Sequence, residues 1–315
     1  MMTEIIARAL VPIFFVIALG YFAGRRRAID NHHVGELNVL VMQFALPASL
    51  FVATASTPRS NMLSEGSLFL VLGLVMMALY AAWYGLARVQ GKATRQEAAV
   101  QALTVSLPNY AAAGLPIILA VAGPAGAVHV AVAIAAGSIL PSPVTLFILE
   151  LAQPKEGGGA RRALVGKALS RALLKPIVLA PLAGTVVSLS GLHLDALVIS
   201  SLQLIGAAAG GVALFLTGLV LSSQPFRLDL PVATAALAGN ILKPALVWAL
   251  TLLVPMPPDL ARAAILLSAL PAGFFGILFG VSYRTASLEA GSMVIASTVF
   301  SVVTVGGLIA LHYRG

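Results

Sequence analysis

Long apolar runs, separated by short polar connections, extend over the whole chain. Each run is long enough to cross the hydrocarbon core of a bilayer, which takes about 20 apolar helical residues. None shows the alternation of polar and apolar positions that is typical of membrane β-strands. The pattern therefore predicts an all-α membrane protein with ten transmembrane helices. The predicted spans cover residues 4–24, 36–55, 67–88, 98–122, 127–151, 173–191, 197–221, 231–254, 261–281 and 289–312.

The fourth span is interrupted by residues that disfavour a continuous helix. VSLPNYAAAGLPIILAVAG, residues 105–123, contains Pro108, Asn109, Gly114 and Pro116. Proline removes a backbone N–H and clashes with the preceding turn, and in lipid every freed backbone group needs another partner. We therefore expect a broken helix that lines a polar cavity. A kinked structural helix is the alternative, because Gly and Pro are common in transmembrane spans.

The ninth span carries a corresponding interruption. Its segment LLSALPAGFFGILFG, residues 266–280, contains Pro271, Gly273 and Gly276. A pair of Gly/Pro-interrupted spans at corresponding positions of two halves is typical of a transport site near the middle of the membrane. We therefore expect spans four and nine to form a substrate site together.

Weak similarity relates the two halves of the chain. ALVPI at 9–13 resembles LLKPI at 173–177, ALPASLF at 45–51 resembles GGVALFL at 210–216, and SLPNYAAAG at 106–114 resembles ALPAGFFG at 269–276. The matches share a spacing of about 164 residues. Because five spans per half give the halves opposite orientations, we predict two inverted repeats. They cover residues 1–152 and 173–315, joined by a Gly-rich, flexible cytoplasmic linker at 153–172.

Composition supports the membrane assignment. Of 315 residues, 59% are hydrophobic and 10% are charged, whereas a soluble domain carries roughly 25% charged residues. The first apolar run has no small-residue cleavage site before it ends at Arg25, so it is expected to be a span and not a signal peptide. Cysteine is absent, which excludes disulfides, thiol catalysis and cysteine metal sites.

The distribution of positive charge predicts the orientation. With the N-terminus outside, the inner segments hold most of the 19 Lys and Arg residues, including Arg25–Arg27 and the segment from Lys155 to Lys175. This bias is the positive-inside pattern. Both termini are therefore expected outside a multi-pass protein of the inner membrane. Basic cytoplasmic loops explain the formal net charge of +8 better than nucleic-acid binding does.

Asn109 is the strongest candidate ligand in the fourth span. Its amide offers two donors and an acceptor, and half-helix N-termini add unpaired N–H groups and positive dipole ends. Together these groups suit a carboxylate. The alternative is that the amide only satisfies carbonyls freed by Pro108 and Pro116. Weaker candidates are Ser106, Tyr110, Ser268, Gln43 and Ser138, because a hydroxyl in a span more often bonds its own i−4 carbonyl.

Lys243 lies about halfway along span eight and is followed by Pro244. A lysine at a helix centre costs roughly 2.5–3.5 kcal/mol on insertion scales. It could attract an anionic substrate or replace a coupling cation. Alternatively, it pairs with Asn240 or a freed carbonyl, or it lies nearer an interface.

Catalytic and metal-binding constellations are missing from the spans, so we expect no enzyme, no cofactor and no metal. The acidic residues fall in loops or at span ends, with Glu150 closest to the membrane interior. No histidine has a second ligand at helical spacing. A sodium- or proton-coupled carrier often keeps a carboxylate at the midplane. No P-loop is present, and the chain has no room for the soluble domain of a sensor.

The span-four sequence LPNYAAAGLPI resembles the LPN-x4-G-x-P pattern of the auxin efflux carrier family, which includes the plant PIN-FORMED proteins. ALPAGFFGILF, ELNVLVMQFALPASLF and GGVALFLTGLVL resemble further segments of that family. The resemblance implies two inverted five-span repeats, similar to bile-acid symporters and NhaA-type exchangers. It also implies a scaffold of spans 1, 2, 6 and 7, often dimeric, and a moving transport domain of spans 3–5 and 8–10.

By the same resemblance, spans four and nine cross, and the function is elevator-type transport of organic anions. Asn109 matches the crossover asparagine implicated in binding the substrate carboxylate. Two departures make the second crossover less polar: Gly276 replaces a proline, and Ala272 replaces a polar residue. The long central loop of the plant carriers is absent.

Since bacterial relatives are often described as malonate or other carboxylate permeases, a small organic acid is the expected substrate. The alternative function is a sodium- or proton-coupled symporter or exchanger of the bile-acid type. Expected partners are the organic anion, membrane lipid and a second copy of the chain that binds through the scaffold.

Overall fold

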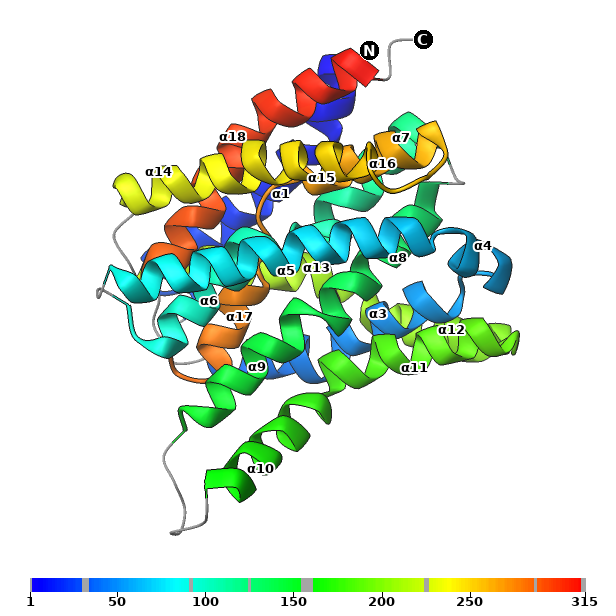
Figure 1. The fold of residues 1–315 in the computed structure, drawn as a ribbon. Coiled ribbons are helices and arrows are strands. Elements are labelled where there is room, and N and C mark those ends of the chain that lie inside the picture. The colour runs from blue at the N-terminus through cyan, green and yellow to red at the C-terminus, as the bar shows by residue number, and fades with distance from the viewer. Residues whose placement is uncertain are drawn as a thin grey trace.

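The computed structural model describes residues 2–29, 34–90, 93–123, 126–153, 161–223, 227–285 and 288–312. Over these residues the protein is all-helical and holds no named strand (Figure 1). The helices occupy the ten ranges predicted from the apolar pattern, and several ranges contain two or three successive helical segments. The start of α1 and the end of α18 lie close together (Figure 1).

The segments in the first half are α1 (Met2–Arg25), α2 (Val34–Val39), η2 (Leu40–Ala45), α3 (Leu46–Ala55), α4 (Arg59–Ser64), α5 (Gly66–Val89), α6 (Arg95–Ser106), η3 (Tyr110–Gly114), α7 (Leu115–Ala122), α8 (Ala127–Ile139) and α9 (Pro141–Leu151). Those in the second half are α10 (Arg161–Leu173), α11 (Pro176–Ser190), α12 (Ala196–Gly206), α13 (Ala208–Ser222), α14 (Leu230–Leu237), η5 (Ala238–Leu242), α15 (Lys243–Thr251), α16 (Pro258–Ser268), α17 (Phe275–Ser282) and α18 (Leu288–His312). The labels η2, η3 and η5 denote π-helical turns.

Six helical stretches of the described chain are long and apolar enough to cross a membrane. They are Val34–Ala55, Gly66–Val89, Ala127–Leu151, Ala196–Ser222, Leu230–Thr251 and Glu289–Leu311. Two shorter apolar helices cover Val11–Arg25 and Pro176–Ser190. The predicted class, an all-α membrane protein, is confirmed, while the number of crossings and the side of the termini stay predictions.

The linker prediction was wrong over part of its length. Residues 161–173 form the helix α10, which packs against α9, where a flexible segment was expected. The Gly-rich part, residues 154–160, lies outside the described residues. Glycines at 157–159 dominate the composition of the linker, but the sequence after them is rich in strong helix formers such as Arg, Ala, Leu and Lys.

In each of two helix pairs, the helices pack closely because a glycine lies at the contact. α1 packs along α13, and an added Cβ on Gly20 would overlap the carbonyl oxygen of Phe215 and lie 3.1 Å from the nitrogen of Leu219. α11 packs along α3, and an added Cβ on Gly184 would lie 2.6 Å from the carbonyl oxygen of Phe51 and 3.1 Å from the nitrogen of Ala55. Such backbone contact at small residues is typical of membrane helix pairs.

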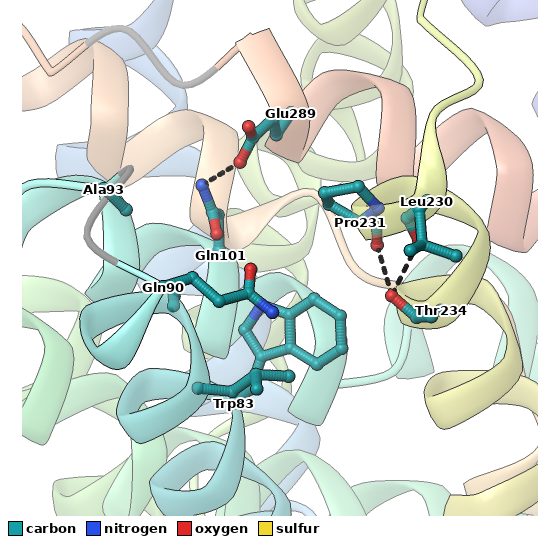
Figure 2. A pocket seen from close by; sticks show the side chains of 10 residues that line it. Trp83, Gln90, Ala93, Gln101, Leu230, Pro231, Thr234 and Glu289 are labelled. Atoms are coloured by element: carbon teal, nitrogen blue, oxygen red, sulfur yellow. Dashed lines mark hydrogen bonds between the residues drawn. The ribbon is translucent and has the colours of Figure 1, made fainter.

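A cavity of about 290 Å³ opens between the ends of α5, α6, α14 and α18 (Figure 2). At its edge the side chain of Gln101 donates a hydrogen bond of 2.5 Å to the Glu289 carboxylate. The Thr234 hydroxyl, which also lines the cavity, bonds the carbonyls of Leu230 and Pro231 in its own helix. The bond between Gln101 and Glu289 ties the start of α18 to α6.

We expect Gly20→Ala and Gly184→Ala each to lower the free energy of unfolding by about 1–3 kcal/mol, because the new methyl group would separate the paired helices. Thermal unfolding in detergent, followed by tryptophan fluorescence, measures the loss. Gly85→Ala in α5 is the matched control, since an added Cβ there meets nothing within 4 Å. Equal midpoints for all three variants would contradict close glycine packing.

Candidate functional site

The fourth and ninth predicted spans both break, and their broken segments run past each other. α6 ends at Ser106 and α16 ends at Ser268. Between them, Pro108 and Ala272 form an isolated antiparallel bridge. The Asn109 N–H donates to the Pro271 carbonyl at 2.8 Å, and the Gly273 N–H donates to the Leu107 carbonyl at 2.9 Å. We call the segments 107–109 and 269–274 the first and second arms of the crossing.

Local sequence signals set both where α6 begins and where it breaks. A capping box starts α6, since the Thr94 hydroxyl accepts from the Glu97 N–H at 3.2 Å and the Glu97 carboxylate accepts from the Thr94 N–H at 2.7 Å. Pro108 then cannot donate to the preceding turn, and the residue before a proline favours extended backbone. Leu107 adopts that conformation, with φ −97° and ψ 110°.

Glycine brings the second arm into backbone contact with the first. An added Cβ on Gly273 would lie 2.9 Å from the Leu107 carbonyl oxygen and 3.2 Å from that of Pro108. On Gly276 it would overlap the Thr104 hydroxyl and lie 2.7 Å from the Val100 carbonyl oxygen. Gly276 therefore allows α17 to pack directly on α6.

Asn109 is buried at the crossing, with 5% of its surface exposed. Its backbone joins the two arms on one side. On the other side its carbonyl accepts hydrogen bonds from the N–H groups of Ala113 and Gly114, both at 3.1 Å. The residue thus stands where the first arm ends and η3 begins, and Pro116 follows in the first turn of α7.

Lys243 reaches the same break from α15. Its side chain is 1% exposed, and Nζ lies 3.5 Å from the Val105 carbonyl oxygen. In a continuous helix that oxygen would accept from the N–H of residue 109, which here bonds Pro271 instead. Lys243 therefore caps a carbonyl that the break has freed. This contact matches the freed-carbonyl alternative raised from the sequence, while the depth of Lys243 in the membrane and its part in binding or coupling stay predictions.

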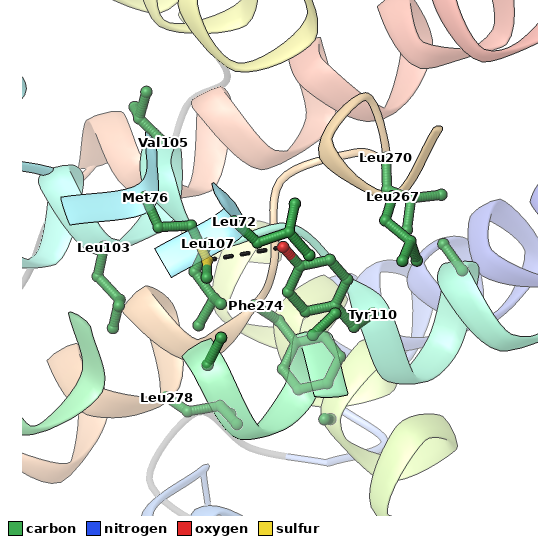
Figure 3. Packing of buried hydrophobic residues seen from close by; sticks show 14 of the residues in the cluster. Leu72, Met76, Leu103, Val105, Leu107, Tyr110, Leu267, Leu270, Phe274 and Leu278 are labelled. Atoms are coloured by element: carbon green, nitrogen blue, oxygen red, sulfur yellow. Dashed lines mark hydrogen bonds between the residues drawn. The ribbon is translucent and has the colours of Figure 1, made fainter. Parts of the chain in front are cut away.

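Tyr110 and the serines of the predicted site are buried, and Ser106 and Ser268 bond carbonyls of their own helices. The Tyr110 hydroxyl lies 3.6 Å from the sulfur of Met76, among Leu72, Leu267, Phe274 and other apolar side chains (Figure 3). The Ser106 hydroxyl lies 3.5 Å from the Leu103 carbonyl, and the Ser268 hydroxyl donates to the Ile265 carbonyl at 2.7 Å. Ser138 is buried in α8, whereas Gln43 is exposed in η2 and does not belong to the buried crossing.

Sequence reasoning missed the contact that holds the second arm from behind. The Ala272 N–H donates to the Ser297 hydroxyl of α18 at 2.9 Å, and that hydroxyl donates to the Asn240 side chain at 2.6 Å. An asparagine in an apolar span signals a buried polar partner. Nothing in the sequence, however, distinguishes Ser297 from the other hydroxyl residues of the tenth span.

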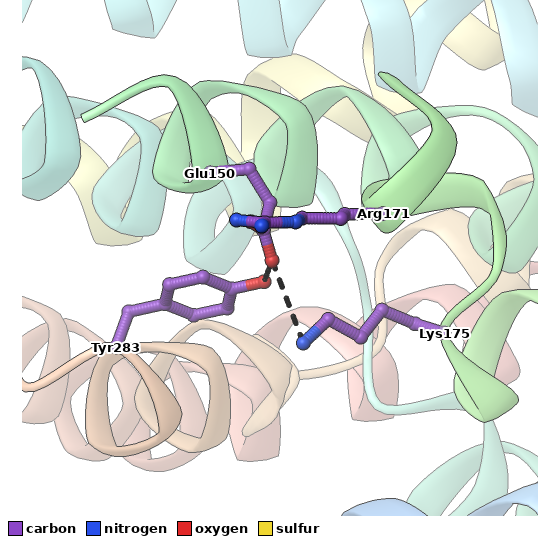
Figure 4. Close-up of polar contacts among 4 residues, drawn as sticks. All are labelled: Glu150, Arg171, Lys175 and Tyr283. Carbon is purple, nitrogen blue, oxygen red and sulfur yellow. Dashed lines mark hydrogen bonds and ion pairs between the residues drawn. The ribbon is translucent and has the colours of Figure 1, made fainter. Parts of the chain in front are cut away.

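A charged cluster lies at the end of α9, away from the crossing (Figure 4). The Tyr283 hydroxyl donates to the Glu150 carboxylate at 2.6 Å, and Lys175 and Arg171 place nitrogens 3.5 Å and 3.9 Å from it. Burial, followed by the bond to Glu150, raises the pKa of the Tyr283 phenol, so the phenol keeps its proton and remains the donor. Glu150 is therefore an ion-paired carboxylate of this cluster.

No group of three or more His, Asp or Glu side chains in the described ranges is arranged to hold a metal ion. His129 and Glu65 form a single pair at 2.6 Å between the starts of α8 and α5. The crossing itself brings together the Asn109 residue, the Lys243 ammonium and backbone N–H and C=O groups.

An all-helical membrane protein with two broken helices joined at their breaks has the features of a secondary transporter. Residues 5–309 match the family described as membrane transport protein, and the chain belongs to this family. It is the auxin efflux carrier family that the LPN motif resembles, so that assignment is confirmed.

Two relatives align with nearly the whole chain. The uncharacterized transporter YfdV of Escherichia coli (strain K12) is 29% identical over 297 residues, which cover 94% of each protein. A putative malonate transporter of Rhizobium meliloti (strain 1021) is 25% identical over 310 residues, which cover 97% of this chain and 95% of the relative. The family and these relatives are transporters, which agrees with the expectation of a carrier.

Gly276→Ala should force α17 away from α6 and cost about 1–3 kcal/mol of stability, since the added methyl group would overlap the Thr104 hydroxyl. Thr104→Ala in the same chain should recover part of that loss. Thermal unfolding of purified protein measures both effects. Gly307→Ala in α18, where an added Cβ meets nothing within 4 Å, serves as the control. A Gly276→Ala protein as stable as the control would show that the contact is not tight.

Proposed function

We propose that the protein is a secondary transporter of small organic anions, chiefly carboxylates, and that it binds its substrate at the crossing. One observation carries the proposal: a fully buried lysine lies at the break of a membrane helix, and no acidic side chain of the described residues pairs with it. A buried cation without a counter-charge is costly. An anionic substrate would supply that charge.

Other groups at the crossing favour the same ligand. The helical segments that continue each broken span begin beside the arms, at Tyr110 and Phe275. Their N-termini direct N–H groups and a positive dipole end toward the crossing. Asn109, which carries an amide side chain, is buried at the same break that Lys243 contacts through the Val105 carbonyl. The similarity to a putative malonate transporter also supports a small carboxylate.

Local contacts support an inverted repeat. The bond from Asn109 to Pro271 and the bond from Gly273 to Leu107 exchange when residues are shifted by about 164 positions. The same shift converts the Gly20 contact with Phe215 and Leu219 into the Gly184 contact with Phe51 and Ala55. This register pairs Asn109 with Gly273, one residue away from the match of Pro108 with Pro271 suggested by the sequence.

We propose the family's elevator arrangement on this basis. The scaffold would comprise α1, α2–α3, α11 and α12–α13, and it would hold a second copy of the chain. The remaining long helices would move the crossing across the inner membrane, with both termini outside. In this arrangement the Glu150 cluster crosses the domain boundary, because Arg171 and Lys175 precede the scaffold helix α11 while Glu150 and Tyr283 end two mobile spans.

Uptake into proteoliposomes tests the proposed function, with a panel of carboxylates and separately imposed sodium, proton and voltage gradients. We expect saturable carboxylate flux, and a tenfold to hundredfold weaker apparent affinity for Asn109→Ala, because hydrogen bonds to charged groups contribute about 1.5–3 kcal/mol. Lys243→Met should weaken affinity similarly. Gln203→Ala, an exposed amide of α12, is the matched control. Absence of saturable carboxylate flux under every gradient would reject the function.

Labelling of an introduced cysteine tests the role of the Glu150 cluster, since the chain has 0 cysteines of its own. A Ser106→Cys reporter at the crossing is buried in this structure, so it would be labelled only from the side to which a conformation of the transport cycle opens it. Glu150→Gln weakens the contacts with Lys175 and Arg171, so we expect labelling to rise on one side and to fall on the other. Tyr283→Phe, which keeps the ring and loses the donor, should act in the same direction. Unchanged labelling from both sides would remove the cluster from the transport cycle.

A further inference from the structure

The second arm of the crossing rests on two polar residues that are far apart in the sequence and outside the substrate-facing groups. Asn240 and Ser297 are 1% and 3% exposed. They form a closed pair: the Ser297 hydroxyl donates to Asn240 Oδ1 at 2.6 Å, and Asn240 Nδ2 donates to the Ser297 carbonyl at 3.0 Å. The Ser297 hydroxyl then accepts the Ala272 N–H at 2.9 Å.

Ser297 differs from its hydroxyl neighbours in the same helix. Thr298 donates to the Val294 carbonyl at 2.6 Å, and Ser301 donates to the Thr298 carbonyl at 2.7 Å. Bonding to the helix's own carbonyls is the ordinary behaviour of hydroxyls in apolar helices. The Ser297 hydroxyl instead donates its proton to Asn240 Oδ1, which leaves a lone pair of the Ser297 oxygen to accept the Ala272 N–H.

The π-helical turn η5 places Asn240 in this role. The turn covers Ala238–Leu242 and inserts one residue into an otherwise α-helical span. Such insertions are rare and occur frequently at functional sites. Asn240 and Lys243 are buried, whereas Ile241 and Leu242 between them are exposed. Asn240 in this turn contacts the second arm by way of Ser297, and Lys243, the first residue after the turn, contacts the end of α6 directly.

The second arm has no polar side chain of its own at this point, because Ala272 and Gly273 occupy it. Its position depends on backbone bonds: Gly273 bonds the first arm, and Ala272 bonds Ser297. We infer that Asn240 and Ser297 are positioning residues, which hold the Ala272–Gly273 backbone at the geometry that an anion at the crossing requires. This inference rests on the proposed function for its effect on transport, but not for its effect on the arm.

Hydrogen exchange of substrate-free protein tests the structural part directly. Ser297→Ala removes the acceptor, so exchange of the peptide covering residues 269–274 should rise at least tenfold while α5 peptides stay unchanged. Asn240→Ala should raise exchange in the same peptide, and the double variant should add little, because the two residues act as one unit. Thr298→Ala is the matched control on the neighbouring turn, and Ser297→Thr, which keeps the hydroxyl, should restore protection.

The transport consequence is measured with the same variants in proteoliposomes. Ser297→Ala should weaken the apparent carboxylate affinity roughly tenfold with little change in maximal rate, and Ser297→Thr should restore the affinity. Unchanged exchange at 269–274 in Ser297→Ala would overturn the inference. A rise of equal size in α5 would also overturn it, by showing a general loss of structure. If wild-type protein moves no carboxylate, the proposed function fails, and the exchange result still decides the role of the pair.

Discussion

Two helices that break inside a membrane create a demand for hydrogen bonds that lipid cannot meet. The crossing meets this demand within the protein. Each arm donates one backbone N–H to the other, and Lys243 and Ser297 satisfy further groups that the breaks release. The remaining features of the site depend on this exchange, because an arm without partners would return to a helix or open to water.

The groups that satisfy the arms also give the site its charge. Lys243 caps the carbonyl of Val105, so the break that the prolines create holds a cation in the interior of the protein. Gly273 and Gly276 let the second half of the protein approach closely enough for these contacts to form. The residues that satisfy the broken backbone are therefore among those proposed to bind the anion.

Much of the fold could be predicted because long apolar runs and interrupting prolines are local signals. They located the helices, the breaks at Pro108 and Pro271, and the family. The helix α10 was missed, since three glycines dominated the composition of its surroundings. The one-residue register between the arms and the partnership of Ser297 with Asn240 depend on three-dimensional packing, which no sequence period records. Gln43 was selected for its polarity alone, and it proved to be exposed.

In the crossing, main-chain atoms hold the two arms in place, and side chains are left to contact a ligand. Many binding sites use the same groups for both tasks. The bonds from Asn109 to Pro271 and from Gly273 to Leu107 join main-chain atoms, so most side chains at these positions can change without removing them. Ala272, which has only a methyl side chain, takes part in the crossing through its backbone alone. Under the proposed function, side chains around a constant backbone joint could be replaced without breaking the crossing, so carriers with different substrates could diverge from one architecture.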